Sequence, residues 1–288
     1  MRAAGRSALL AILLAVWSVA AGGGHDMVTE VFLLAGQSNM DGRGDGGQLT
    51  PEDRLRLDAA RDRVSLAYNG RRPAPLDVSV AQPHIARKFG LESTFGPELF
   101  FGIRLAEAWP GKDIHLVKRS LGGTSLYGAW NPHWSRDKAA LMNEADRPQL
   151  FRELVNDIAA MEARFGGRPF RYAGMLWVQG ETDSNVQKFG PLPAASYGAN
   201  LKALIRAVRE VTGEANLPFY LLQVGGGDVV EGMRSAAAEM ANVHFIPQSK
   251  DPESPAYLPG YGPPVGHYNY EGMKRIGLRF AAEVLNNR

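Results

Sequence analysis

Short β-rich runs alternate with amphipathic runs along most of the chain, and this alternation limits the folds that it can adopt. The β-rich runs are "VFLLA" at 31–35, "DIHLVKRS" at 113–120, "YAGMLWVQG" at 172–180, "PFYLLQVG" at 218–225 and "VHFIP" at 243–247. Apolar residues recur at helical spacing between them, as at Leu150, Leu154, Ile158 and Met161. Strands separated by helices predict an α/β fold with a central five-stranded parallel sheet and helices on both faces.

Composition and charge narrow the class of protein further. The 288 residues are 45% apolar, enough to bury the core of a single domain, which we expect over 26–288. The balance of 32 basic and 30 acidic residues, with no basic cluster, gives no indication of a nucleic-acid partner. The chain has no cysteine, so disulfides, thiolate metal sites and a cysteine nucleophile are excluded.

The first 24 residues have the three-part composition of a secretory signal peptide. Arg2 and Arg6 precede an apolar run at 8–16, and the small residues Ser18, Ala20 and Ala21 follow. A retained membrane anchor is the alternative, but the apolar run is short for a bilayer. We therefore predict a cleaved signal over 1–24, a secreted or periplasmic protein, and no stable membrane insertion after cleavage.

Unusual polar residues follow three of the predicted strands, at 36–39, 122–125 and 179–183. Ligands of parallel α/β sheets bind outside the carboxyl ends of the strands, so these segments are expected to form a site together. The Pro/Gly-rich stretch at 251–266 reads as a long surface loop, and such loops are often functional.

The segment "GRGDGG" at 42–47 imitates two kinds of ligand site. A dinucleotide loop would begin at the strand end and open into a helix, but Gly36 already ends the strand and "QLTP" follows the last glycine. A calcium loop would need an oxygen ligand where Arg43 stands. A flexible glycine loop is the better interpretation.

Ser38 follows the first strand, where a serine is either a helix cap or a nucleophile. A nucleophilic serine requires a histidine base and donors for the oxyanion. His267 stands between the Pro/Gly-rich loop and the last amphipathic run, on a segment that could reach a strand-end serine. The other histidines lie at the signal boundary (His25), in strand patterns (His115 and His244) or in loops (His84 and His133).

Four blocks in this order resemble a known superfamily. They are "GQSNM" with Ser38, "GGTS" at 122–125, "WVQGETD" at 177–183, and His267 before an amphipathic helix. The sequence resembles the SGNH hydrolases, and among them the sialate O-acetylesterase-like branch, carbohydrate esterase family 6. The similarity extends over about 31–285, nearly the whole chain after the predicted signal.

The resemblance implies a three-layer, flavodoxin-like α/β/α sandwich that hydrolyses acetyl esters on acetylated polysaccharides or sialic acids, without metal or organic cofactor. It implies that Ser38 is the nucleophile and His267 the general base. The oxyanion would be bound by the backbone N–H groups of Ser38 and Gly123 and by the side chain of Gln179. A merely buried, hydrogen-bonded amide remains the alternative for Gln179.

The sequence departs from the superfamily at the residue that orients the histidine. The usual pattern is Asp-x-x-His, but Pro264 stands three residues before His267. Glu181 is the first candidate for the missing acid, Asp251 the second and Asp183 the third. A Ser–His dyad or a loss of activity are the other interpretations.

Further residues near the blocks are predicted to bind substrate: Gln37, Asn39, Thr124, Trp130 and Asp183. The aromatic residues Tyr127, Trp130 and Trp134 could form a platform for a sugar ring or simply cover the sheet edge, and Arg43 and His133 could line the mouth. Two other functions stay open, a non-catalytic glycan-binding protein on the same fold and an esterase for longer acyl chains. The sequence specifies neither the sugar nor the oligomeric state.

Overall fold

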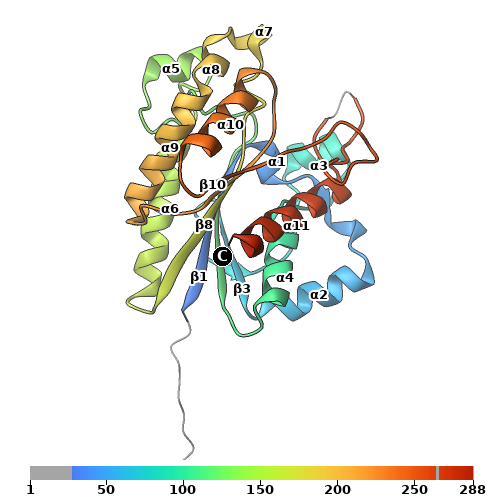
Figure 1. The fold of residues 1–288 in the computed structure, drawn as a ribbon. Coiled ribbons are helices and arrows are strands. Elements are labelled where there is room, and N and C mark those ends of the chain that lie inside the picture. The colour runs from blue at the N-terminus through green and yellow to red at the C-terminus, as the bar shows by residue number, and fades with distance from the viewer. Residues whose placement is uncertain (1–27, 264–265, 288) are drawn as a thin grey trace, which may run out of the picture.

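The computed structural model describes residues 28–263 and 266–287 and contains one large, twisted sheet (Figure 1). The predicted signal peptide lies outside these residues. The strand order is β10-β9-β8-β1-β7-β3-β4, and all neighbours are parallel except β3 and β4. The strands are β1 (Thr29–Gly36), β3 (Val64–Tyr68), β4 (Ala74–Pro75), β7 (Ile114–Ser120), β8 (Phe170–Val178), β9 (Phe219–Leu222) and β10 (Val243–Ile246).

The predicted α/β architecture is confirmed, and the five predicted strands correspond to β1, β7, β8, β9 and β10. The sheet is larger than expected, because β3 adds a sixth parallel strand and β4 an antiparallel edge. β3 is only five residues long and lies between charged segments, so its apolar signal is weak. β4 has two exposed residues including Pro75, which only an edge strand accommodates.

Helices cover both faces of the sheet (Figure 1). On one side α4 (Glu98–Ala108) packs against both α2 (Pro51–Arg61) and α11 (Tyr270–Asn286). On the other side lie α6 (Leu150–Phe165), α9 (Tyr197–Thr212) and α10 (Asp228–Glu239), of which α9 and α10 pack together. The remaining elements are shorter: α1 (Ser38–Asp41), η1 (Gly46–Gln48), α3 (Pro83–Phe89), α5 (Arg136–Leu141), α7 (Val186–Phe189), α8 (Leu192–Ala195), and a small sheet of β2 (Gly44–Asp45), β6 (Ser93–Phe95) and β5 (Ser79–Val80).

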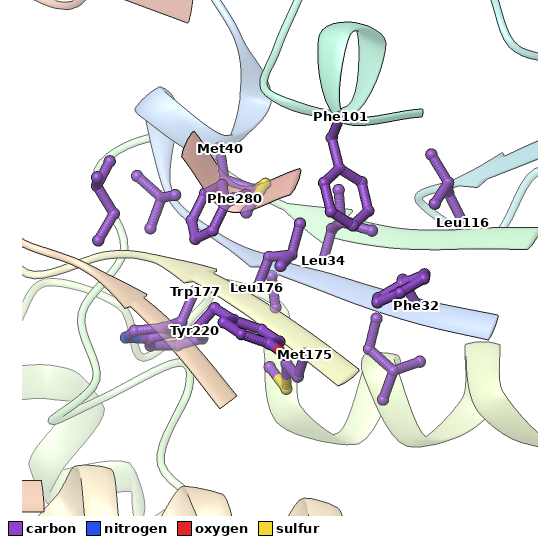
Figure 2. Packing of buried hydrophobic residues seen from close by; sticks show 14 of the residues in the cluster. Phe32, Leu34, Met40, Phe101, Leu116, Met175, Leu176, Trp177, Tyr220 and Phe280 are labelled. Atoms are coloured by element: carbon purple, nitrogen blue, oxygen red, sulfur yellow. The ribbon is translucent and has the colours of Figure 1, made fainter. Parts of the chain in front are cut away.

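The core explains why β1 reads as a continuous apolar run. Residues 31–35 are fully buried, as is typical of a central parallel strand with helices on both sides. Figure 2 shows Phe101 of α4 and Phe280 of α11 over one face of the sheet, with Met175 on the other. The rings of Phe32 and Phe101 meet edge to face at 5.0 Å, so strand and helix interlock.

The prediction of a flexible glycine loop at 42–47 is wrong for most of that segment. Gly42, Arg43, Gly44 and Gly46 are buried, and Gly44 pairs with Phe95 across β2 and β6. A Cβ at position 42 would lie 2.3 Å from the Phe95 carbonyl oxygen. These glycines therefore allow close backbone packing and do not make the segment mobile.

Removal of the Phe101 ring tests the interlocked core. Phe101→Ala leaves a cavity between α4 and β1, and the expected loss in free energy of unfolding is about 3–5 kcal/mol. Urea denaturation measures the loss. Leu55→Ala is the matched control, because Leu55 on α2 is 72% exposed, and it is expected to change stability by no more than about 0.5 kcal/mol. Equal effects of the two substitutions would contradict this packing.

Candidate active site

The end of β1 delivers Ser38 to the carboxyl edge of the sheet. A Cβ at Gly36 would lie 2.1 Å from the Val178 carbonyl oxygen, so only glycine lets β1 and β8 approach this closely. The Gln37 N–H then donates to Val178 O at 3.0 Å, and Ser38 begins α1. The N-cap position belongs to Gln37, so Ser38 is not a helix cap.

His267 lies against this serine. Its Nε2 is 2.9 Å from Ser38 Oγ, within hydrogen-bond distance, as the sequence predicted for a nucleophile and its base. His267 has a φ of +72°, a backbone conformation uncommon for a residue with a side chain. The main chain around it supports this conformation, since Tyr261 N–H donates to His267 O at 2.9 Å and Tyr268 bridges to Gly260.

Glu181, the first candidate for the orienting acid, is directed toward Asn39. Asn39 Nδ2 donates to Glu181 Oε1 at 2.7 Å, and Asn39 Oδ1 accepts the N–H of Tyr268 at 3.3 Å. The other oxygen, Oε2, is buried and has no hydrogen-bond partner within the described residues. Burial raises the pKa of Glu181 above its ordinary value. The acid is thus linked to the histidine segment through the asparagine.

The two other candidate acids have different surroundings. Asp251 is exposed and accepts the N–H of Glu253 at 3.0 Å. Asp183 is fully buried and accepts the N–H groups of Leu126 and Tyr127, each at 2.9 Å. It braces the segment after "GGTS", and it is not among the residues that line the cleft described below. Its predicted substrate-binding role is therefore wrong.

The side chain of Gln179 belongs to the same buried hydrogen-bond network as Asp183. It is fully buried, and its Nε2 donates to Asp183 Oδ2 at 2.6 Å, with Thr124 O at 3.1 Å and Gln37 Oε1 at 3.3 Å as further acceptors. Its Oε1 accepts from the hydroxyl of Tyr197 at 3.1 Å. The amide has two N–H bonds and three internal acceptors, so it has no N–H group left to donate to an oxyanion. The buried-amide alternative is the correct one.

Thr124 and Trp130 lie in the interior and not in the cleft. Both are fully buried, and the indole Nε1 of Trp130 donates to Thr124 Oγ1 at 3.2 Å. The Trp130 ring packs edge to face on Trp177 at 5.3 Å. The prediction that these two residues bind substrate is wrong, because the side chains after "GGTS" fold back onto the sheet.

Backbone donors for an oxyanion remain beside Ser38. As the first residue of α1, Ser38 has an N–H without an intrahelical acceptor. Gly122 and Gly123 form the turn after β7, and no protein acceptor within the described residues takes their N–H groups. A Cβ on Gly122 would be 3.5 Å from Ser38 Cβ, so this turn lies against the serine.

A cleft of about 800 Å³ opens over Ser38 and His267. Of the predicted residues, Gln37, Asn39, Gly123 and Glu181 also line it. The structure adds cationic and aromatic residues that no motif indicated: Lys88 and Phe89 from α3, Lys188 and Phe189 from α7, and Arg147. Arg43 and His84 line it as well, whereas His133 is exposed elsewhere.

A buried ion pair supports the serine loop from below. Lys118 in β7 is 1% exposed, donates to Glu98 Oε2 at 2.6 Å and reaches the carbonyl oxygen of Asp41 at 3.1 Å. Asp41 in turn accepts from the hydroxyls of Tyr68 at 2.6 Å and Ser120 at 2.8 Å. A lysine inside the apolar run "IHLVKRS" was the sequence signal for this support.

Comparison with known proteins identifies the family. A family profile described as "carbohydrate esterase, sialic acid-specific acetylesterase" matches residues 28–286. The chain belongs to this family. It is a carboxylic ester hydrolase, and removal of O-acetyl groups from carbohydrates is the family's activity. The resemblance drawn from the four sequence blocks is confirmed.

Solved structures share the fold of this esterase at low sequence identity. A protein from Arabidopsis thaliana is 22% identical with a TM-score of 0.62, over 90% of this chain and 99% of that one. A carbohydrate acetylesterase from Xanthomonas citri is 19% identical with a TM-score of 0.56, over 90% of this chain and only 56% of its own length. NanS is 16% identical with a TM-score of 0.57, over 91% and 98%. Comparison with curated proteins finds no match.

Two searches of residues 28–263 and 266–287 were negative. In that part of the esterase, no group of three or more His, Asp or Glu side chains is placed to hold a metal ion. Over the same residues, no helix is long and apolar enough to cross a bilayer.

The pH dependence of stability tests the burial of Asp183 in this hydrogen-bond network. Burial raises the pKa of Asp183 to about 7, whereas in the unfolded chain this carboxyl has its ordinary pKa near 3.8. The folded state therefore holds this proton between about pH 4 and 7, and the contribution of Asp183 to stability falls as the pH rises through that window. Thermal unfolding of the protein and of Asp183→Asn should show an advantage of the native residue that shrinks from pH 4 to 7.

The substitution also places an amide N–H₂ among N–H donors, so the variant is expected to be less stable by about 1–3 kcal/mol. Asp58→Asn is the control, because the Asp58 side chain is 65% exposed. A difference between the protein and Asp183→Asn that stays constant with pH would contradict the raised pKa.

Proposed function

We propose that this esterase removes O-acetyl groups from acetylated carbohydrates through an acyl-enzyme on Ser38. The 2.9 Å approach of His267 Nε2 to Ser38 Oγ, inside a cleft beside free backbone donors, carries the proposal. The described relatives, a carbohydrate acetylesterase and NanS, support a sugar ester as substrate.

The reaction follows from the positions of these groups. His267 Nε2 takes the proton of the Ser38 hydroxyl as Oγ bonds to the acetyl carbon, and the carbonyl oxygen becomes an oxyanion. The N–H groups of Ser38 and Gly123 stabilise that charge. The C–O bond to the sugar then breaks, and the alcohol leaves with the proton from His267. Water attacks the acetyl-enzyme by the same route and releases acetate and Ser38.

The charge of the cleft favours a sugar that carries a carboxylate. Arg43, Lys88, Arg147 and Lys188 line it, against the carboxylates of Asp41 and Glu181. Asp41 is already engaged by Arg43 and two hydroxyls, and burial raises the pKa of Glu181. Lys88, Arg147 and Lys188 form no ion pair within the described residues, and their charges favour an acidic acetylated sugar of the sialic acid type.

We propose export as well, to the periplasm or the medium. The support is the three-part composition of the first 24 residues, with two arginines before an apolar run and small residues after it.

Replacement of the nucleophile tests the mechanism. Ser38→Ala should lower acetate release from O-acetylated sialic acid, and turnover of nitrophenyl acetate, by at least about 10³-fold. A fluorophosphonate probe should label the protein and not the variant. Ser235→Ala, outside the cleft on α10, is the control and should retain full activity. Turnover that survives Ser38→Ala would contradict the mechanism, and a butyrate ester hydrolysed as fast as acetate would indicate an esterase for longer acyl chains.

Glu181 acts, in this proposal, by holding Asn39 and not by contacting the base. One substitution separates the two roles. Glu181→Gln keeps an oxygen acceptor for Asn39 and should cost less than about tenfold in kcat, whereas loss of a directly orienting carboxylate can cost about 10⁴.

A double-mutant cycle completes the test. Asn39→Ala and Glu181→Ala should each lower kcat, and the double variant should be little worse than either, because both remove one link to Tyr268. Additive losses would show that the two residues act separately.

A further inference from the structure

Two arginines flank the Gly122–Gly123 turn that follows β7. A Cβ atom on Gly122 would lie 3.5 Å from Ser38 Cβ and 3.6 Å from Arg43 Nη2. The guanidinium and the nucleophilic residue therefore lie near the same glycine. Arg147 Nη1 donates to Gly122 O at 3.2 Å and to Gly123 O at 2.9 Å. Two positive charges therefore lie close to the turn.

Arg43 is the buried member of the two. Its side chain is 5% exposed, and its Nε has no hydrogen-bond partner within the described residues. Its closest bond is to the Gly42 carbonyl oxygen at 2.6 Å, while Asp41 Oδ2 is farther away, 3.3 Å from Nη2 and 3.4 Å from Nη1. A desolvated guanidinium with so loose a counter-ion has an effect on nearby charge that water does not screen.

Asp41 pairs with Arg43, but it is not the group nearest to the turn. Its Oδ1 accepts from the hydroxyls of Tyr68 and Ser120, and only Oδ2 is within hydrogen-bond distance of the guanidinium. Arg43 Nη2, and no oxygen of Asp41, is among the atoms nearest to the Gly122 position. The positive end of the Asp41–Arg43 pair thus lies toward the Gly122–Gly123 turn, which also lies against Ser38.

We propose that Arg43 is a positioning residue of the esterase whose charge stabilises the oxyanion across the Gly122–Gly123 turn. This proposal depends on the serine mechanism proposed above. Arg43 supplies the contribution expected from Gln179, whose amide is consumed by Asp183, Thr124 and Gln37.

Arg147 adds to the same effect through the peptide bond. It binds the carbonyl oxygen of Gly122, which belongs to the same peptide unit as the Gly123 N–H. A hydrogen bond at the C=O end polarises the amide and makes its N–H a stronger donor. Arg147 is exposed, so water screens much of its charge, and its contribution is smaller than that of Arg43.

The charge is required only when the oxyanion exists, and this separates the proposal from a structural role. Loss of one oxyanion donor typically lowers kcat by about 10²–10³. Because Arg43 acts across a turn, Arg43→Gln is expected to lower kcat on nitrophenyl acetate by about 10- to 100-fold, with KM within about threefold. Arg147→Gln should lower kcat by about three- to tenfold. The control is Arg152→Gln, an exposed arginine of α6 outside the cleft, which should leave kcat unchanged.

The inhibition constant of phenylboronic acid distinguishes an effect on oxyanion binding from a loss of folded protein. It adds to a reactive serine as a tetrahedral anion, so its inhibition constant reports the binding of an oxyanion. That constant should rise in Arg43→Gln by nearly the factor by which kcat falls, and Arg43→Lys, which keeps the charge, should recover part of both. Circular dichroism and the melting temperature identify any loss of folded protein, for which kcat is corrected.

Two results would overturn the role of Arg43: a corrected kcat within about threefold of the native value, or an unchanged phenylboronic acid constant despite a lower kcat. Ser38→Ala is assayed in parallel. Turnover that survives that substitution refutes the serine mechanism itself, and this outcome is distinct from a failure of Arg43 alone.

Discussion

The ends of β1 and β8 lie so close together that the residue at position 36 must be glycine. A Cβ there would stand 2.1 Å from the carbonyl oxygen of Val178, and the next N–H is bonded to that same oxygen. The contact turns the chain directly into α1, with Ser38 as its first residue. Since β1 lies between β7 and β8, the segments that leave all three strands converge on one serine. The site is a consequence of strand order.

Buried carboxylates give these loops their precise shape. A loop without regular secondary structure leaves N–H groups without partners, and each must find an acceptor when it is buried. Asp183 accepts two N–H groups from the segment after the glycine turn, and Glu144 accepts those of Ser125 and Ala129. Removing either acid would leave several buried N–H groups without an acceptor. The geometry of the cleft therefore depends on two acids that do not line it.

The sequence predicted which segments would meet but not which side chains would face the ligand. Strand alternation and the four blocks located the sheet edge, Ser38 and His267 correctly. Gln179 and Trp130 were misplaced because orientation after a strand end depends on local hydrogen bonds, here those of Asp183 and Thr124. Burial of Arg43 beside the serine depends on folding of the whole chain, and no spacing rule describes it.

Main-chain hydrogen bonds fix the segment that carries the base, in a chain that lacks the usual Asp-x-x-His pattern. The carbonyl oxygen of His267 accepts from Tyr261 N–H, and the N–H of Tyr268 reaches Asn39, which Glu181 holds in turn. Main-chain hydrogen bonds do not require particular residue types. The sequence therefore shows that the motif lacks its acid, but it does not show the bonds that position the segment instead. In the proposed mechanism the carboxylate of Glu181 acts one step away, through Asn39, on the segment that carries the imidazole. The position of His267 Nε2 relative to Ser38 then depends on the conformation of that segment. The φ of +72° at His267 makes this conformation costly to form, so it persists only where the surrounding structure fixes it.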